Sequence, residues 1–154
     1  MRSEPAVTEW LLSSQDHPRI PLGDWSVGRP ALLRGGRAFD AVRMRAELVH
    51  AAIGCTAPAD VAAALAELLD GPVIADPGSW YYGLVPPRTT ETWRSSLAVV
   101  LGSGSWIVVP VLTKEGPAGP YWAVPPAQYG TLCDPQDLAE LLRVGDVRLG
   151  GVAP

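Results

Sequence analysis

Histidine, cysteine and paired carboxylates are scarce in this chain of 154 residues. The two histidines are His17 and His50, and the two cysteines are Cys55 and Cys133. Two cysteines are too few for a disulfide framework or a four-cysteine zinc site, so we expect two buried thiols. No Asp-x-Asp or Asp-x-Glu pair is present, although metal-dependent phosphoryl transfer usually needs two close carboxylates. The sequence therefore predicts no catalytic centre, no metal site and no cofactor.

Long apolar runs are also lacking, since none reaches the roughly 18–20 residues that a membrane-spanning helix needs. No signal peptide opens the sequence, and we expect a cytoplasmic protein. The net charge is -4, but residues 1–45 carry seven arginines against five acidic residues. The acidic remainder argues against broad, non-specific DNA binding. The composition does not exclude a local arginine patch near residues 29–45.

Glycine and proline are abundant, with 16 of each, and they mark the boundaries of the predicted elements. We divide the chain into an irregular segment over residues 1–36 that packs on the domain, an α+β core domain over residues 37–146, and a tail over residues 147–154. Within the first segment a short helix is predicted over residues 5–12. The breakers that follow it predict an irregular chain over residues 13–36.

Apolar periodicity predicts the helices and strands in the first half of the core. A strand is predicted over residues 38–44 and a helix over 45–53 that Gly54 ends. A second helix begins near Pro58 and stops at Gly71. Two strands joined by a Pro-Gly turn follow, over residues 72–76 and 80–85.

Residues 89–101 are ambiguous. Trp93, Leu97 and Leu101 have helical spacing and predict a helix, whereas Val99 and Val100 favour a strand followed by a hairpin loop at 102–104. We choose the helix.

The densest apolar run ends in residues 105–112, SWIVVPVL, which predict a strand that is apolar on both faces and central to the packing. Residues 121–124 are its expected hairpin partner. The closing helix is the best specified element, because Asp134 and Pro135 form an N-cap signature. Gly145 is expected to end it. The whole order predicts a single α+β domain with a ferredoxin/RRM-like split βαβ core, an antiparallel-dominated sheet and helices packed on one face.

Two sets of residues are candidates for a binding site. The basic cluster consists of Arg29, Arg34, Arg37 and Arg43, and arginine forks onto phosphate groups. Sheet aromatics form the second set, because aromatic side chains on central strands stack bases in RRM-type domains. Trp80 and Tyr82 must point to one face of their strand and Tyr81 to the other, so only one face can take a ligand.

Several motifs carry a resemblance to a known family. They are RAFDAVRM (37–44), GPVIAD (71–76), YYGLVPPRTTETW (81–93), LGSGSWIVVPV (101–111), YWAVPP (121–126) and GTLCDPQDLAELL (130–142). Over residues 30–145 the chain resembles the bifunctional DNA primase/polymerase N-terminal domain-like proteins of the archaeo-eukaryotic primase superfamily. Catalytic members use an acidic metal-binding pair and a nucleotide-contacting histidine, and neither is matched here. The resemblance therefore implies a degenerate member that keeps the scaffold without the chemistry.

Two hypotheses follow for the function. The first is a non-catalytic binding module that acts by protein–protein interaction as an accessory or regulatory factor. Six tryptophans in 154 residues is a high number, and this hypothesis requires some of them to be exposed. The alternative is a nucleotide or single-stranded nucleic-acid binding protein that uses Arg29, Arg34, Arg37 and Arg43 with Trp80 and Tyr82.

Overall fold

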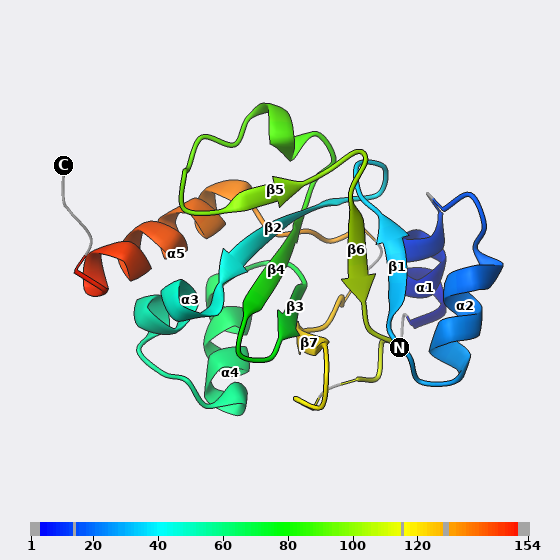
Figure 1. Cartoon of the computed structure of the whole chain (residues 1–154), viewed down its shortest axis with the longest axis horizontal. Coiled ribbons are helices and arrows are strands. Elements are labelled where there is room, and N and C mark those ends of the chain that lie inside the picture. Colours follow the sequence, from blue (N-terminus) through cyan, green and yellow to red (C-terminus); the bar gives the residue numbers. More distant parts are fainter. Residues whose placement is uncertain (1–3, 14, 115, 128–129, 151–154) are drawn as a thin grey trace.

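The computed structural model describes residues 4–13, 15–114, 116–127 and 130–150 (Figure 1). The α-helices of these residues are α1 (Glu4–Leu12), α2 (Arg19–Ser26), α3 (Ala46–Ile53), α4 (Pro58–Leu68) and α5 (Pro135–Arg148). The strands are β1 (Ala31–Arg34), β2 (Asp40–Arg45), β3 (Val73–Asp76), β4 (Trp80–Val85), β5 (Val99–Leu101), β6 (Trp106–Val109) and β7 (Tyr121–Val124). A single 3₁₀ turn, η1 (Thr89–Glu91), precedes β5. Part of the predicted tail, residues 151–154, lies outside the described residues, as do residues 1–3.

The strands form two antiparallel sheets, so the α+β class is confirmed. Five strands pair in the order β5-β2-β4-β3-β7, and β1 and β6 form a separate two-stranded ribbon. The ferredoxin/RRM-like split is not confirmed, because the strand order differs and β6 lies outside the larger sheet. The strong pairing of β2 with β4, from Asp40 opposite Val85 to Arg45 opposite Trp80, fixes the centre of the molecule.

Hydrophobic side chains cover both faces of the five-stranded sheet. On one face Val42, Met44 and Tyr81 pack with residues of α3, α4 and α5. On the other face Phe39 and Leu84 pack with residues of α1, β1 and β6. Helices α3 to α5 do occupy one face, as expected, but the opposite face is partly covered by the ribbon and α1 (Figure 1). The domain thus has three layers.

The prediction of an irregular chain over residues 13–36 is wrong for α2 and β1. The breaking residues lie where an element tolerates them. Pro21 occupies the first turn of α2, where its missing N–H has no helical acceptor. Gly28 has a φ of +77° after the helix ends, and Pro30 immediately precedes β1. Clustered breakers here separate two short elements instead of excluding them.

The central role predicted for residues 105–112 is also wrong. Within the described ranges β6 pairs only with β1, and the side chains of β6 alternate between exposed and buried. The predicted helix over 89–101 is wrong as well, since these residues form η1 and then β5, which pairs with β2. The predicted hairpin of 121–124 with 105–112 does not form, because β7 pairs with β3. Pro110 follows the last residue of β6, where no ladder hydrogen bond is required of it.

Helix α5 begins as predicted and ends later than predicted. The side chain of Asp134 accepts the backbone N–H of Gln136 at 2.9 Å, which confirms the N-cap. Gly145 lies inside the helix and does not end it. A Cβ atom at Gly145 would collide with the backbone carbonyl of Leu48 on α3. This glycine is therefore a close-packing position between α3 and α5.

Candidate binding surface

The outer face of the β1–β6 ribbon is built from four side chains. Strand alternation turns Leu33 and Ile107 into the core and turns their neighbours outward. In the antiparallel register Leu32 lies opposite Val108, and Arg34 lies opposite Trp106. Leu32 is 54% exposed, Trp106 53% and Val108 38%. We call these four side chains, Leu32, Arg34, Trp106 and Val108, the ribbon face.

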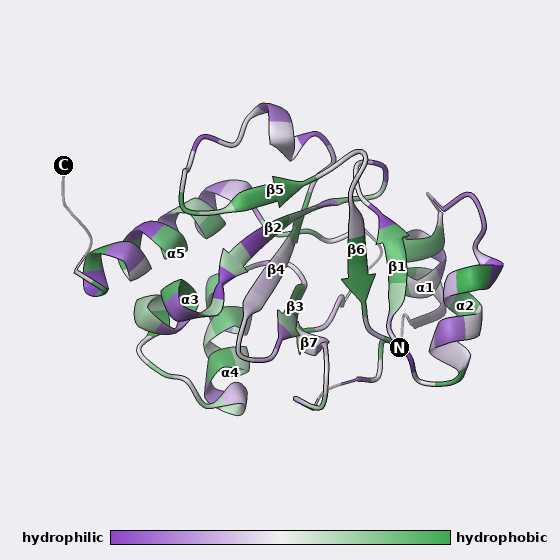
Figure 2. Ribbon diagram, viewed as in Figure 1, coloured by the Kyte–Doolittle hydropathy of each residue, from purple (hydrophilic) through white to green (hydrophobic). Residues whose placement is uncertain are grey.

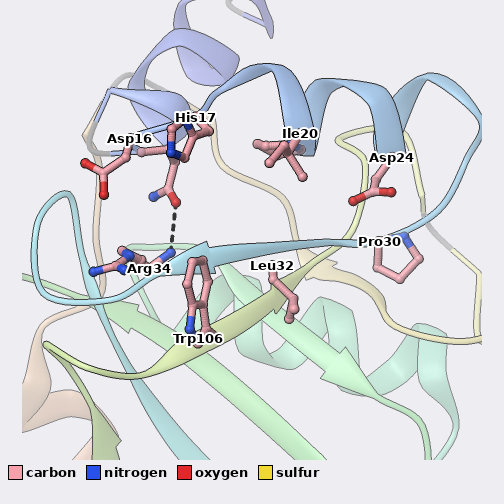
Figure 3. Close-up of a pocket in the computed structure, with 10 residues that line it drawn as sticks. Asp16, His17, Ile20, Asp24, Pro30, Leu32, Arg34 and Trp106 are labelled. Carbon is pink, nitrogen blue, oxygen red and sulfur yellow. Dashed lines mark hydrogen bonds between the residues drawn. The ribbon is translucent and has the colours of Figure 1, made fainter.

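Helix α2 and the loop before it stand beside the ribbon face and enclose a pocket with it (Figure 3). The pocket has a volume of about 460 Å³, within the range of roughly 300–1,000 Å³ that is usual for small-molecule sites. The residues that line it are Gln15, Asp16, His17, Ile20, Pro21, Asp24, Pro30, Leu32, Arg34 and Trp106. Figure 2 shows β6 as strongly hydrophobic. This α2–ribbon pocket therefore combines apolar surface with a rim of polar and charged groups.

Arg34 is held at one end of the pocket by two contacts. Its backbone N–H donates to Oε1 of Gln15 at 2.9 Å, which is the dashed line in Figure 3. Its guanidinium carbon lies 5.0 Å from the centroid of the Trp106 ring, a cation–π arrangement. No carboxylate of the described residues forms an ion pair with Arg34. The positive charge of Arg34 therefore stands at the pocket without an ion pair among those residues, although it also helps to lower the pKa of Asp16.

The other arginines near the pocket are neutralised. Arg37 pairs with Asp16 at 2.8 Å, and Arg29 pairs with Asp24 at 3.3 Å. The hydrogen bond from Arg37 is the main cause that lowers the pKa of Asp16 below its ordinary value. These side chains are largely exposed, and such pairs contribute little stability. They do remove two of the predicted cations from any shared phosphate-binding patch.

A second cluster lies on the five-stranded sheet, on the face away from α3 to α5. The guanidinium carbon of Arg43 lies 4.5 Å from the centroid of the Trp80 ring. Tyr82 lies opposite Arg43 in the β2–β4 register. Burial is the main cause that raises the pKa of Tyr82, and the nearby carboxylate of Asp76 adds to the rise. The alternation predicted for Trp80 and Tyr82 against Tyr81 is confirmed, because Tyr81 alone of the three packs among the helices.

The six predicted site residues therefore fall into three places. Arg43, Trp80 and Tyr82 come together on the larger sheet, Arg34 stands at the α2–ribbon pocket, and Arg29 and Arg37 pair with acids. Trp106, Leu32 and Ile20 are the residues that sequence reasoning missed. Residues 106–109 are all apolar, so no alternation in the sequence indicated which side chains of β6 are exposed.

His50 pairs with a tyrosine, with its Nε2 2.7 Å from the hydroxyl oxygen of Tyr81. Burial lowers the pKa of His50 and is the main cause that raises the pKa of Tyr81 to about 12. Both groups are therefore neutral at physiological pH. Cys55 and His50 line one open, shallow cavity. Among the described residues no group of three or more His, Cys, Asp or Glu side chains is arranged to hold a metal ion.

Comparison of the chain with protein-family models, curated proteins and solved structures finds no match. In the described part of the chain, no single helix is long and apolar enough to cross a bilayer. Helices α3 and α4 reach that length only together, and they meet at a bend of 75°.

Proposed function

We propose that this chain is a non-catalytic binding module that recognises a segment of a protein partner through the ribbon face and the α2–ribbon pocket. One observation carries the proposal. Trp106 is half exposed on the ribbon face, with Arg34 over its ring and Leu32 exposed beside it. Tryptophan and arginine are the residues most enriched at the energetic centres of protein interfaces. An accessory or regulatory role is the class of function that fits such a module.

The charges near the pocket favour a protein segment over a nucleic acid. Asp16 and Asp24 line the pocket and pair with Arg37 and Arg29, so the pocket presents acids as well as bases. Phosphate-binding surfaces depend on several unpaired cations. An apolar side chain that enters between Ile20 and Trp106, with a carboxylate near Arg34, matches the surface better. We retain the primase/polymerase resemblance as part of this proposal, with the chain as a degenerate member.

The test is selection of peptides on the purified protein from a random library displayed on phage, followed by calorimetry with the recovered peptides. Trp106→Ala should weaken binding by about 30-fold or more, as expected for a tryptophan hot spot of at least 2 kcal/mol. Trp80→Ala is the matched control, since Trp80 also lies under an arginine but on the other sheet. Selection of no peptide, or peptides that bind Trp106→Ala as tightly as the wild type, would contradict the proposal.

A nucleotide or single-stranded nucleic acid is the second candidate ligand, because Arg43, Trp80 and Tyr82 do come together on one sheet face. Aromatic stacking is worth about 1–3 kcal/mol per base. Titration with single-stranded DNA and with nucleoside triphosphates at low salt tests this candidate. Arg43→Ala should abolish saturable binding, while Arg34→Ala, the arginine over the other exposed ring, should leave it unchanged. Absence of binding by the wild-type protein would remove this candidate.

A further inference from the structure

The outer edge of β6 has no partner strand among the described residues. In that part of the chain β6 pairs with β1 alone. The backbone N–H of Gly35 donates to the carbonyl of Ser105 at 3.0 Å, which makes Gly35 and Ser105 a hydrogen-bonded pair of the ladder. Because bonded pairs recur at every second residue of an antiparallel ladder, Leu33 and Ile107 form the next bonded pair. The N–H and C=O groups of Trp106 and Val108 therefore point away from β1.

These four main-chain groups have no hydrogen-bond partner among the described residues. The corresponding group on the opposite strand does have one, since the N–H of Arg34 donates to Gln15. Helices α1 and α2 also lie beside β1 (Figure 1), so the outer edge of β1 is partly covered. An unpaired strand edge is a template for another extended segment, and proteins usually block such edges. Here Pro110 limits the edge at one end and leaves Trp106 and Val108 open.

The β1–β6 ribbon does not fully cover the five-stranded sheet. Part of the sheet face on the ribbon side is only partly buried, and we call it the half-open part of the larger sheet. On the ribbon side of β2, Ala41 is fully buried, as is Phe39 just before the strand, whereas Arg43 is only partly buried. On β4 the same gradient runs from buried Leu84 to partly buried Trp80. In Figure 1 β1, α1 and α2 lie on one side of β6, and the ends of β2 and β4 where this gradient opens lie on the other.

We propose that an extended peptide segment of a partner protein, with acidic side chains at alternate positions, pairs with the open edge of β6 and becomes the third strand of the ribbon. Its main chain would bond to Trp106 and Val108. One set of its alternating side chains would face the half-open part of the larger sheet. The proposal goes beyond the function proposed above, because it does not require the α2–ribbon pocket to be occupied.

The charge at the half-open face specifies the acidic character of the segment. Arg43 forms no hydrogen bond or ion pair with the described residues, and its Nε atom is buried without a partner. Its guanidinium contacts the ring of Trp80 and is only partly buried. A carboxylate on the added strand would supply the acceptor that this cation lacks. Strand addition of this kind takes its affinity from the main chain and its specificity from alternate side chains.

The test uses a capped hexapeptide of alternating glutamate and valine as the probe, with a lysine–valine hexapeptide as its charge control. Amide hydrogen exchange of the full-length protein is followed by NMR as each peptide is added. We expect the Trp106 and Val108 amides to exchange freely in the unbound protein and to become protected by the glutamate peptide. The lysine peptide should bind at least tenfold more weakly, and Arg43→Ala should remove that preference.

Val108→Pro is the decisive variant, because it removes an N–H that points to the open edge while the β1 ladder keeps its own bonds. Val108→Thr keeps that N–H and is its matched control. Val108→Pro should bind the glutamate peptide at least tenfold more weakly than Val108→Thr. Ile20→Ala changes the α2–ribbon pocket and leaves the edge of β6 intact. It should weaken peptides selected at the pocket and leave binding of the glutamate peptide unchanged, so the two proposals fail separately.

Three results would overturn the inference. The first is no protection of Trp106 or Val108 at millimolar peptide. The second is equal binding by Val108→Pro and Val108→Thr. The third is a dimer of the peptide-free protein in sedimentation that Val108→Pro abolishes, since a second copy would then fill the edge.

Discussion

Asp40 is the buried charge that the fold has to accommodate. Its side chain is fully buried at the start of β2. One carboxylate oxygen accepts the backbone N–H of Thr90 at 3.3 Å, and the other has no hydrogen-bond partner among the described residues. Burial raises the pKa of Asp40 above its ordinary value, although backbone N–H groups such as that of Thr90 act in the opposite direction. The residue therefore links the stability of the protein to pH.

The sign of this link follows from the raised pKa. The folded protein holds the proton of Asp40 over a pH range in which the unfolded chain, with a pKa of about 3.9, has released it. The protonated Asp40 therefore contributes its full stabilisation below the unfolded-state pKa. This contribution to the unfolding free energy is lost as the pH rises through the folded-state pKa. Unfolding free energies by urea denaturation should fall with pH more steeply for the wild type than for Asp40→Asn, by at most about 1.4 kcal/mol per pH unit. Parallel curves would show that Asp40 does not carry the effect.

Gly145 provides a residue-scale prediction about packing. Gly145→Ala should destabilise the protein by about 1–2 kcal/mol, because overpacking against the Leu48 carbonyl outweighs the better helix propensity of alanine. Gly23→Ala in α2 is the matched control. No atom lies within 4 Å of a Cβ at Gly23, so this change should stabilise the protein by up to about 1 kcal/mol. Urea denaturation measures the unfolding free energy of both variants. Equal changes in the two would refute the close-packing role of Gly145.

Among the elements, α5 has the clearest local determinant. Asp134→Ala should cost about 1 kcal/mol of unfolding free energy, because the N–H of Gln136 loses its acceptor. Asp146→Ala, in the last turn of the same helix, is the control. An acid there opposes the helix dipole, so its removal should be neutral or slightly stabilising. Thermal unfolding that gave equal losses for both variants would contradict the capping assignment.

The difference between local and distant determinants explains which elements could be predicted from the sequence. The start of α4 and the β3–β4 hairpin are set by residues next to them, Pro58 and the turn at Pro77-Gly78, and these predictions are confirmed. Helix α4 ends at Leu68, earlier than the predicted stop at Gly71. The strand partners of β5, β6 and β7 are distant along the chain, and the sequence has no local signal for them. β6 was predicted to pair with its neighbours in sequence, but its partner β1 lies about 75 residues earlier. Strand alternation was recoverable from sequence, and sheet membership was not.

At the scale of the whole molecule, the candidate surface could be predicted only in part. Arg43, Trp80 and Tyr82 gather because they share one face of adjacent strands, which alternation predicts. The α2–ribbon pocket instead unites residues 15–34 with Trp106, and no local pattern places them together. The pairing of Arg37 with Asp16 likewise depends on how the chain turns between α1 and α2. The N-terminal segment therefore contributes a wall of the proposed site as well as a cover for the core.

The exposed and buried tryptophans permit one direct test of the ribbon face. The indole N–H signals of the six tryptophans can be followed by NMR while a peptide selected on the protein is added. Trp122 is the internal reference, because it is buried and its indole N–H donates to the Pro110 carbonyl at 3.1 Å. We expect the Trp106 signal to move with saturation while the Trp122 signal stays fixed. A stationary Trp106 signal with a moving Trp80 signal would contradict the account and place the binding surface on the five-stranded sheet.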